Sequence, residues 1–451
     1  MDRFVNGRRV FLNNTNAMTE QSNRVFLLSL GCSKNTVDSE RLMAQAEAAG
    51  VVFTESASDA ETIIINTCGF IADAKEESIN ETLAAITEKE SGRVRKIFVM
   101  GCLPELYRSE LQTELPEVDG FFGTRELPAI LTAIGARYRS ELHLHRSLTA
   151  PGHTSFLKIS EGCSRSCSFC SIPRIRGPYI SQPLDQLLRE ARLLQEKGVQ
   201  ELNIIAQDIT LYGVDLYGRQ MLNDLLLRLS DMAFHWIRLL YAYPLNFPLE
   251  VIETMSQRGN ICNYLDLPLQ HCNDRILRSM NRGITKEGEL ALIEAIRQKN
   301  PDIRLRTTMI AGYPGETRQE FEELLEFAAT VRFDRLGCFS YCHEEFSPAF
   351  ALEDSVPEEE KQSRTAELME LQEGISEEKN KRLEGREIAV CIDRIEENTA
   401  WGRTEWDAPE VDNECSLEGA GHTIAPGSFC LARIDGSSPY ELFGTVLKVL
   451  E

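Results

Sequence analysis

The first third of the chain alternates short apolar runs with longer amphipathic stretches. The apolar runs are expected to be strands and cover residues 25–30, 62–67 and 96–100. The amphipathic stretches are expected to be helices and cover residues 36–49 and 73–89, and Pro104 opens another. Strands that alternate with helices are typical of a parallel sheet. We therefore predict a doubly wound parallel α/β domain over residues 23–140, preceded by a disordered extension at residues 1–22.

The middle of the chain repeats this pattern more often. Its six strand-like runs cover residues 155–160, 202–207, 236–243, 263–269, 304–310 and 335–341. The amphipathic stretches between them cover residues 184–197, 222–232, 248–257, 286–299 and 320–331. Repeated strand and helix units form a parallel sheet or barrel whose active site lies at the carboxyl ends of the strands. Six units predict a partial (β/α)6 barrel in a domain at residues 141–382.

The pattern changes again after a charged helical stretch at residues 358–381. Short β-rich runs with Gly and Pro turns follow at residues 387–392, 401–404, 429–434 and 443–450. They indicate a small antiparallel β-barrel, which resembles the TRAM domain of RNA-modifying enzymes. The expected fold class is therefore α/β multidomain, with this barrel at residues 383–451.

Composition narrows the class of protein. The chain has 451 residues, of which 42% are hydrophobic and 26% charged, as in a folded protein of two or three domains. No apolar run reaches the roughly 18 residues that a membrane helix needs, and the N-terminal residues lack the apolar block of a secretory signal. Thirteen cysteines without an export signal are typical of a reducing compartment. We expect a cytoplasmic protein with no membrane partner.

The charge bears on the partner. The formal net charge is -22, and residues 383–451 alone contain 14 Asp and Glu against 5 Lys and Arg. Proteins bind phosphate backbones largely through Lys and Arg, so the balance disfavours nucleic acid, and tRNA is not expected as a partner. An acidic surface is better matched to a basic polypeptide.

Three cysteines stand close together after the first strand-like run of the middle region. Cys163, Cys167 and Cys170 have C-x3-C-x2-C spacing. Thiolates select zinc, copper(I) or iron-sulfur clusters, but structural zinc takes four ligands, usually from two C-x2-C pairs. Three thiolates on a [4Fe-4S] cube leave one iron open for catalysis, whereas ferredoxin clusters have a fourth cysteine. A partial zinc site or three buried thiols is the alternative.

A cysteine also follows each strand-like run of the first region: Cys32, Cys68 and Cys102. Ligands bind beyond the carboxyl ends of the strands in open parallel sheets, so we expect these distant thiols to converge at one edge. We interpret them as a second three-cysteine cluster site, with chance placement as the alternative. The glycines beside them would let the backbone approach a cluster closely, and they are Gly31, Gly69 and Gly101.

Polar residues follow several expected barrel strands, namely Gln207, Asp208, Tyr243, Gln270 and His271. Each could line the active-site cavity or only satisfy hydrogen bonds at its strand end. The fifth strand leads into a turn whose glycines permit close approach to a ligand, and the turn contains Gly312, Pro314, Gly315 and Glu316. Thr317 and Glu320 have capping-box spacing, which gives the same turn a purely structural reason.

The cysteine spacing, with Phe169 before the last cysteine, resembles the signature of the radical S-adenosylmethionine (SAM) enzymes. The resemblance implies that Cys163, Cys167 and Cys170 hold a cluster whose open iron binds the methionine part of SAM and whose electron cleaves SAM to a 5'-deoxyadenosyl radical. It also places Phe169 near the adenine and the glycine turn beside the adenosine. With Gln207 from the strand-end set, the expected SAM-binding residues are Phe169, Gln207, Gly312, Pro314, Gly315 and Glu316.

Residues 29–40, 66–71 and 100–104 are similar to the N-terminal domain of the methylthiotransferases. In that family an auxiliary [4Fe-4S] cluster bears or supplies sulfur, and electrons come from a flavodoxin-like or ferredoxin-like donor. One subfamily modifies an adenosine in tRNA. The other modifies the β-carbon of an aspartate in a basic small-subunit ribosomal protein, the one numbered twelve, and residues 29–35, 161–173 and 403–412 favour this protein modifier.

The resemblance thus implies two [4Fe-4S] clusters, SAM as radical source and methyl donor, and a ribosomal protein as substrate. Cys163, Cys167 and Cys170 would serve SAM cleavage, while Cys32, Cys68 and Cys102 would present sulfur. Two other functions are weighed. One is methylthiolation of tRNA, and the other is an iron-sulfur electron carrier or sensor without turnover, although a carrier needs no cavity for SAM.

Overall fold

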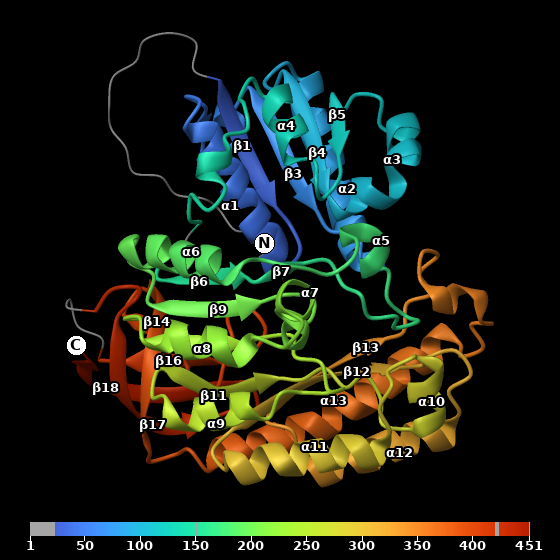
Figure 1. The fold of residues 1–451 in the computed structure, drawn as a ribbon, viewed down its shortest axis with the longest axis vertical. Coiled ribbons are helices and arrows are strands. Elements are labelled where there is room, and N and C mark those ends of the chain that lie inside the picture. The colour runs from blue at the N-terminus through green and yellow to red at the C-terminus, as the bar shows by residue number, and fades with distance from the viewer. Residues whose placement is uncertain (1–22, 150–151, 420–423, 451) are drawn as a thin grey trace.

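The computed structural model describes residues 23–149, 152–419 and 424–450. Three main bodies of β structure follow one another along the chain (Figure 1). The extension expected to be disordered, residues 1–22, lies outside the described residues. Within the described ranges, no helix has both the length and the apolar character to cross a membrane.

The N-terminal region contains a parallel sheet of five strands in the order β2-β1-β3-β4-β5. The strands are β1 (Arg24–Ser29), β2 (Val52–Phe53), β3 (Thr62–Thr67), β4 (Lys96–Gly101) and β5 (Gly120–Phe122). The helices are α1 (Ser33–Glu47), α2 (Ala72–Glu90), α3 (Cys102–Glu114) and α4 (Leu127–Ala133). The predicted parallel α/β arrangement is confirmed. β2 and β5 are absent from the prediction because runs of two and three residues are too short to show a pattern.

Helices cover both faces of this sheet. Ile64 of β3 packs in one buried cluster with Leu42 of α1, whereas Ile63 and Ile65 pack in another with Ile86 of α2. Burial on both faces explains why β3 is apolar at consecutive positions instead of alternating. The same burial holds the carboxyl ends of β1, β3 and β4 in fixed positions, which matters for the cysteines that follow them.

The central region contains an open parallel sheet of six strands in the order β13-β12-β11-β10-β9-β6. The strands are β6 (Thr154–Lys158), β9 (Glu201–Ile205), β10 (Trp236–Leu239), β11 (Ile261–Asp266), β12 (Arg304–Ala311) and β13 (Arg335–Ser340). The edge strands β6 and β13 do not pair with each other, so the predicted partial barrel is confirmed. A short sheet of β7 (Ser160–Glu161) and β8 (Ile180–Ser181) follows β6.

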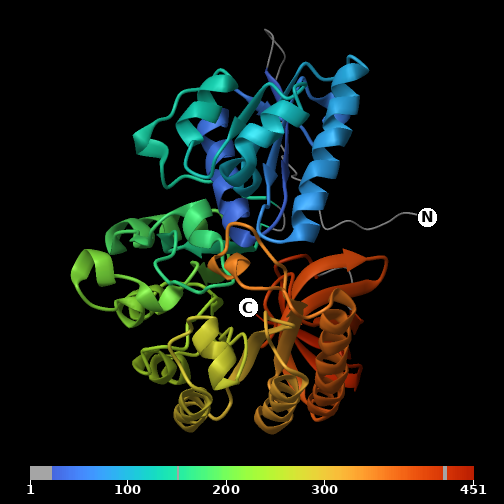
Figure 2. The ribbon, with the colours of Figure 1, turned by 90° about the vertical axis from the view of Figure 1, so that its right-hand side faces the viewer.

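Helices connect and cover these strands. They are α5 (Ile172–Arg176), α6 (Leu184–Glu196), α7 (Val214–Tyr217), α8 (Leu222–Ser230), α9 (Glu250–Gln257), α10 (Asp274–Ser279), α11 (Lys286–Lys299), α12 (Arg318–Val331) and α13 (Glu358–Lys381). The last helix, α13, runs along α12 and leads into the C-terminal barrel (Figures 1 and 2). Short helices α5, α7 and α10 are missing from the prediction because they span only six residues or fewer.

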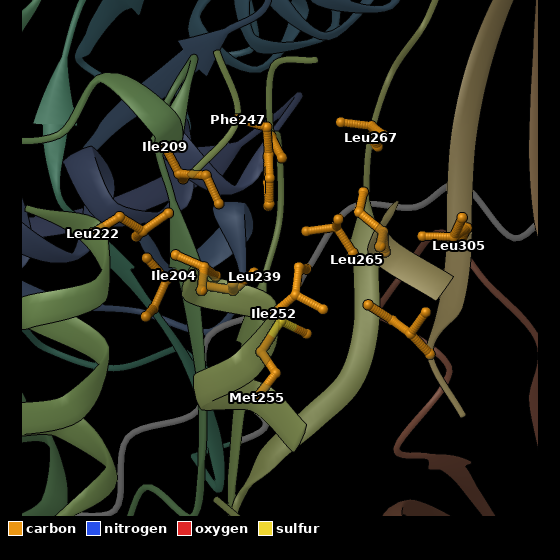
Figure 3. Close-up of a cluster of buried hydrophobic side chains, with 14 of the residues drawn as sticks. Ile204, Ile209, Leu222, Leu239, Phe247, Ile252, Met255, Leu265, Leu267 and Leu305 are labelled. Carbon is orange, nitrogen blue, oxygen red and sulfur yellow. The ribbon is translucent and has the colours of Figure 1, made fainter. Parts of the chain in front are cut away.

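The core of the central region lies between the sheet and its helices. Ile204, Leu239 and Leu265 extend from three neighbouring strands toward Leu222 of α8 and Ile252 of α9 (Figure 3). Each of these side chains is 1% exposed or less, and full burial of one aliphatic side chain stabilises the fold by about 1.5–3 kcal/mol. The alternate positions of the strands face the inside of the barrel and are largely polar, which leaves that face available for chemistry and docking.

The C-terminal region is a closed barrel in the order β14-β15-β16-β18-β17. Its strands are β14 (Glu387–Glu396), β15 (Thr399–Thr404), β16 (Glu414–Glu418), β17 (Phe429–Ser437) and β18 (Glu441–Leu450). The predicted small β-barrel is confirmed, with one difference. β16 is missing from the prediction and pairs with β18 in parallel, so the barrel is not antiparallel throughout.

The loop between β15 and β16, residues 405–413, docks this barrel on the polar inner face of the central sheet. Arg238 donates to the Glu405 carbonyl (2.5 Å), and Arg335 donates to the Asp407 carboxylate (2.6 Å). Arg306 Nε lies 3.2 Å from Asp412 Oδ1. These ion pairs and hydrogen bonds are largely buried, and removing one partner of a buried pair costs about 3–5 kcal/mol. The C-terminal barrel is therefore held in one orientation.

Another buried arginine joins the N-terminal and central regions. Arg146 is 1% exposed and lies in the segment that crosses between them. Its Nε donates to Glu40 of α1 (2.9 Å), while its Nη1 lies 3.3 Å from Glu190 of α6. These two contacts of Arg146 hold the middle of the crossing segment in place.

Candidate active site

The first triad of thiols lies in the loop after β7 and consists of Cys163, Cys167 and Cys170. Cys163 and Cys167 are buried, and Cys170 is half-buried. The loop begins at Gly162, which has φ of 71°, and a Cβ there would lie 2.1 Å from the Pro178 carbonyl oxygen. Only glycine lets the start of the loop pack this closely against the segment that follows α5.

The thiols of the first triad influence one another's ionisation. Burial raises the pKa of Cys163 to about 11 and that of Cys170 to about 12, and neighbouring cysteines add to both shifts. Donors also reach these sulfur atoms, since the Arg165 N–H lies 3.4 Å from Cys163 Sγ and Arg282 Nη1 lies 3.5 Å from Cys167 Sγ. Crowded thiols surrounded by donors suit thiolates that a metal cluster binds and stabilises.

Asp208 and Tyr243, two of the strand-end residues nominated from the sequence, contact this loop. Asp208 accepts from Arg165 Nε (2.8 Å) and caps the turn at residues 209–211. The Tyr243 hydroxyl lies 3.7 Å from Cys167 Sγ, and the guanidinium groups of Arg165 and Arg282 lie 4.0 and 4.1 Å from its ring centroid. Both residues therefore support the cysteine loop directly.

Gln207 and Phe169 were predicted to bind SAM. Gln207 follows β9, and its Oε1 is buried with no hydrogen-bond partner within the described residues. An orphaned buried acceptor at the carboxyl end of a barrel strand fits a residue that binds a ligand donor. Phe169 is half-buried and packs against a cluster that includes Met280, Tyr313 and Tyr341. Their contact with SAM stays a prediction.

The turn after β12 contains the other predicted SAM-binding residues. Gly312 has φ of 78°, and a Cβ there would lie 2.3 Å from Lys361 Cγ of α13. Gly315 also has positive φ, of 76°, but its surroundings are open, and Pro314 is buried. The Glu316 carboxylate is turned back onto its own loop, where it accepts the backbone N–H groups of Gly312 and Tyr313. Glu316 thus shapes the turn, and SAM contact by any of these residues stays a prediction.

The helix that follows this turn has the capping box predicted from its sequence. Thr317 accepts from the Glu320 N–H (3.3 Å), and the Glu320 carboxylate accepts from the Thr317 N–H (2.8 Å). Both reciprocal bonds are present at the start of α12. The structural reason for the sequence is therefore confirmed.

His271 and Gln270 lie at the end of β11 and have structural contacts. His271 Nδ1 accepts from the Asn273 N–H (2.9 Å), and its Nε2 lies 3.8 Å from Glu316 Oε1. Gln270 has φ of 78° and forms an isolated bridge with Met309 of β12. The pair tie the end of β11 to β12 and its turn.

The structure brings the other three cysteines, Cys32, Cys68 and Cys102, together as a second triad at one edge of the N-terminal sheet. A Cβ on Gly31 would lie 2.8 Å from Cys68 Cβ, and a Cβ on Gly69 would lie 2.9 Å from the Leu103 backbone. The glycines therefore let the three cysteine loops approach one another. This packing explains the glycines without the expected close approach of their backbone to a cluster.

Asn35 of α1 joins the loops of the second triad. Its Nδ2 donates to the carbonyls of Leu30 (2.9 Å) and Thr67 (3.0 Å) at the ends of β1 and β3. Its Oδ1 lies 3.9 Å from Cys102 Sγ after β4. One amide thus reaches all three strand ends, which explains why an asparagine stands three residues after Cys32.

The thiols of the second triad differ in acidity. Burial raises the pKa of Cys68 to about 11 and that of Cys102 to about 12, and Cys32 adds to both shifts. Desolvation opposes ionisation of Cys32, but the positive charges of Lys34 and Arg176 and the backbone N–H groups of Asn35 and Lys34 together lower its pKa. Cys32 is the thiolate that forms most readily in this triad and is exposed toward a cavity.

This cavity has a volume of about 1090 Å³ and is lined by all three regions. Cys32 and Cys68 lie in its wall, whereas the first triad does not. Aromatic side chains in the lining include Phe156, Tyr241 and Trp401. Its acidic side chains are Asp266, Asp393, Glu410, Asp412, Glu414 and Glu441, against two arginines, Arg306 and Arg403. The lining therefore contains more carboxylates than arginines, and Asp266, Asp412, Asp393 and Glu414 among them form ion pairs with arginines.

Neither triad is arranged as a site for a single ion. Within the described residues, the metal-ligand group whose atoms all lie within 4.8 Å of one another is His153, Cys391 and Asp393. Zinc bound by thiolates at about 2.3 Å would need such close spacing. One member of this group, Asp393, is already paired with Arg403, whose Nε and Nη2 donate to its carboxylate (2.7 and 2.8 Å). Among the described residues, neither triad has all three sulfur atoms within 4.8 Å of one another.

Three family models match successive parts of the chain. The family described as "Uncharacterized protein family UPF0004" matches residues 24–123, the "Radical SAM superfamily" matches residues 157–328, and the "TRAM domain" matches residues 385–447. The matches fall on the N-terminal region, the central region and the C-terminal barrel in turn.

Curated relatives match over almost the whole chain. A protein of Chlorobium luteolum named ribosomal protein uS12 methylthiotransferase RimO is 70% identical over 96% of this chain and 99% of its own length. A protein of the same name from Pelodictyon phaeoclathratiforme is 69% identical over 95% of this chain and 100% of its own length. The chain belongs to the RimO family. The recognition made from its cysteine motifs is therefore confirmed.

Solved structures support the fold of this RimO family member. The radical SAM methyltransferase TsrM from Kitasatospora setae, solved with cobalamin and a [4Fe-4S] cluster, has a TM-score of 0.55 and 14% sequence identity. The alignment covers 73% of this chain and 77% of TsrM. The same enzyme with tryptophan and a SAM analogue gives a TM-score of 0.53 at 15% identity. These likenesses establish the fold only.

Several residues near the RimO triads are not predicted from the sequence. Arg165 and Arg282 flank the first triad, whereas Arg176 and Asn35 contact the second. Arg165 stands inside the cysteine motif, so its position alone was a signal. Arg176 and Arg282 gave none, because Asn35 and Cys167, which they contact at the triads, lie more than 100 positions away from them in the sequence.

Proposed function

We propose that this protein is a SAM-dependent radical methylthiotransferase that adds a methylthio group to the β-carbon of an aspartate in ribosomal protein uS12. The observation that carries the proposal is full-length identity of about 70% to RimO proteins, which are named for uS12. Both cysteine triads, and the cavity beside the second triad, are consistent with that reaction.

Each triad is suited to hold one [4Fe-4S] cluster. Cys163, Cys167 and Cys170 would hold the cluster that acts on SAM, and Cys32, Cys68 and Cys102 the auxiliary one. Bound there, the two clusters and SAM supply the electron, the radical, the sulfur and the methyl group. Three thiol ligands leave one coordination position free in each cluster.

The protein residues orient and shield these groups. Arg282 and Tyr243 cover Cys167, which limits water at the first triad. Glu316 fixes the backbone of the glycine turn, so that its amides keep one orientation toward a ligand. Gln207 offers an acceptor after β9, next to Asp208, which contacts the cysteine loop. Held in this way, reacting groups need little rearrangement before reaction.

The cavity supports a polypeptide substrate. Its volume of about 1090 Å³ exceeds most small-ligand pockets, which span about 300–1,000 Å³. Its lining has more carboxylates than arginines even though four of the six form ion pairs with arginines, and this balance favours a basic segment over RNA phosphates. An aspartate of uS12 would then reach the second triad through this cavity, which Cys32 and Cys68 line.

The proposal includes a cellular setting. The clusters need a one-electron donor, for which a flavodoxin-like or ferredoxin-like protein has suitable chemistry. Ribosomal proteins and reduced thiols are both found in the cytoplasm, which is where we place the reaction.

The test is activity of anaerobically reconstituted protein with SAM, a reductant, sulfide and a peptide that carries the uS12 aspartate. We expect 5'-deoxyadenosine, and a peptide whose mass increases by one methylthio group on the aspartate. Two comparisons run beside it: the same peptide with asparagine in place of the aspartate, and total tRNA analysed as nucleosides.

Each outcome separates one function from another. Modified tRNA with unmodified peptide would indicate the sister subfamily of tRNA enzymes. Reducible iron without any 5'-deoxyadenosine would indicate an electron carrier or sensor. Modification of the asparagine peptide would contradict the aspartate as the target.

A further inference from the structure

Arg176 is a buried side chain that joins the two triads. It ends α5, which begins two residues after Cys170, and it is 2% exposed. Its helix belongs to the central region, yet its guanidinium group reaches the N-terminal region. No step of the proposed reaction assigns a role to it.

On the side of the second triad, Arg176 meets both a carboxylate and the thiols. Its Nη1 donates to Asp38 Oδ2 (2.9 Å), and its Nη2 donates to Asn35 Oδ1 (2.6 Å). The same Nη2 lies 4.0 Å from Cys102 Sγ. Arg176 therefore contacts α1 and a thiol of the second triad at the same time.

On the side of the first triad, Arg176 forms an ion pair at the start of the cysteine loop. Its Nη1 lies 3.1 Å from Glu161 Oε1, and Glu161 stands two residues before Cys163. The next residue, Gly177, accepts the Cys163 N–H through its carbonyl (3.0 Å). One residue and its neighbour thus contact both cysteine loops.

Arg176 belongs to a group of four charged side chains. Lys158 also pairs with Asp38 and Glu161, so the group has two cations and two carboxylates. The formal charges of these four side chains cancel. Within the guanidinium group of Arg176, Nη1 contacts both carboxylates, whereas Nη2 is the nitrogen that lies near Cys102 Sγ. A buried donor of this kind retains its effect because little solvent screens it.

We propose that Arg176 is a positioning residue that donates to the sulfur of the auxiliary cluster through Nη2 and raises the reduction potential of that cluster. Net charge and hydrogen bonds to sulfur are among the factors that set the potential of an iron-sulfur cluster. The inference rests on the proposed function, since it needs a cluster on the second triad. It adds a residue of the central region to the control of a cluster held by the N-terminal region.

The experiment measures the auxiliary cluster alone in the full chain. Replacing Cys163, Cys167 and Cys170 by alanine removes the first cluster, and the remaining iron is titrated by potential and followed by electron paramagnetic resonance. Arg176→Gln removes the charge in this background. We expect reduction to become about tenfold less favourable, which is a shift of about 59 mV to more negative potential for one electron.

Arg146→Gln is the matched control. Arg146 is equally buried and joins the same two regions, but it pairs with Glu40 and Glu190 and has no thiol partner among the described residues. We expect Arg146→Gln to leave the auxiliary potential unchanged. An equal shift in both variants would mean that loosened docking moves the potential, and would overturn the role of Arg176.

The remaining outcomes are also decisive. An unchanged potential in loaded Arg176→Gln overturns the inference. If Arg176→Gln does not load iron, Arg176→Lys is compared with Arg146→Lys. The inference is supported if Arg176→Lys binds iron and has a shifted potential while the potential of Arg146→Lys is unchanged. It is overturned if the two lysine variants have equal potentials or lose iron equally. Absence of iron from the unsubstituted second triad would instead defeat the proposed function.

Discussion

The two triads place three thiols together in opposite ways. The first takes all its cysteines from eight consecutive residues, 163–170, so one loop decides its geometry. The second takes one cysteine from each of three strand ends spread over residues 32–102. Its geometry depends on a packed sheet, on Asn35 and on glycines that let the loops touch. Local sequence builds one site, and tertiary structure builds the other.

The difference predicts different sensitivities. Substitutions at the first triad act through the ligands themselves and their immediate neighbours. At the second triad, changes that leave every cysteine in place still displace a thiol, because the loops constrain one another. The following predictions test this contrast, beginning with the largest effect.

Loss of one ligand should separate the two sites completely. Cys163→Ala is expected to abolish 5'-deoxyadenosine formation and keep the iron of the second triad. Cys68→Ala is expected to abolish methylthio transfer and keep cleavage of SAM. Iron content and the two products are measured on anaerobically reconstituted protein. Loss of all iron in both variants would show that the sites are not independent.

A backbone substitution should reach only the second triad. Gly31→Ala adds a Cβ 2.8 Å from Cys68 Cβ at φ of 85°, whereas Gly50→Ala meets the same strain at φ of 86° with nothing within 4 Å. Strain alone costs about 1–2 kcal/mol. We expect Gly31→Ala to lose iron from the second triad, measured in the background without the first cluster, and Gly50→Ala to keep it. Equal iron content in the two variants would remove the proposed loop constraint.

A substitution on α13 should weaken SAM binding near the first triad without changing the iron content. Arg364 is 5% exposed, and its Nη1 donates to the Glu316 carbonyl (3.0 Å) behind the glycine turn. We expect Arg364→Ala to raise the KM for SAM about tenfold, equivalent to about 1.4 kcal/mol, with normal iron content. Arg318→Ala is the control, since Arg318 pairs with Glu367 of the same helix but is exposed. That exposed pair contributes about 1 kcal/mol or less, and its loss should leave the KM unchanged.

The smallest effect is expected on the free energy of unfolding at acidic pH. Although burial opposes ionisation of Glu161, Lys158 and Arg176 lower its pKa to about 2 from 4.5. Its stabilising contribution is therefore present above about pH 4.5 and is lost as the pH falls toward 2. Glu161→Gln should remove this part of the acid dependence. The free energy of unfolding of iron-free protein, measured from pH 6 to pH 2 in roughly half-unit steps, tests it, and parallel curves for both proteins would contradict it.

The sequence predicts the sites that local pattern builds. The spacing of Cys163, Cys167 and Cys170, the cysteine after each N-terminal strand and the capping box at Thr317 all follow from short stretches of chain. The six-stranded sheet follows from repeated apolar runs. Each of these features leaves a signal in residues near one another in sequence, so one sequence is enough to reveal it.

Contacts between regions cannot be predicted in this way. Arg176 and Asn35 are 141 positions apart, and Arg146 and Glu40 are 106 apart. No periodicity links such partners, because their proximity depends on how three separately folded cores pack. The same reason applies to residues 403–412, which serve in the sequence as a mark of the subfamily. In the structure much of this segment docks the C-terminal barrel on the central sheet.

That docking loop limits how the chain can be recombined with its relatives. An exchanged C-terminal barrel would bring its own carboxylates to arginines selected for another set, and Arg238, Arg306 and Arg335 would be left facing mismatched partners. Chimeras should therefore fold well only when the loop and these arginines are transferred together. Evolution of a new substrate preference in this barrel has the same constraint.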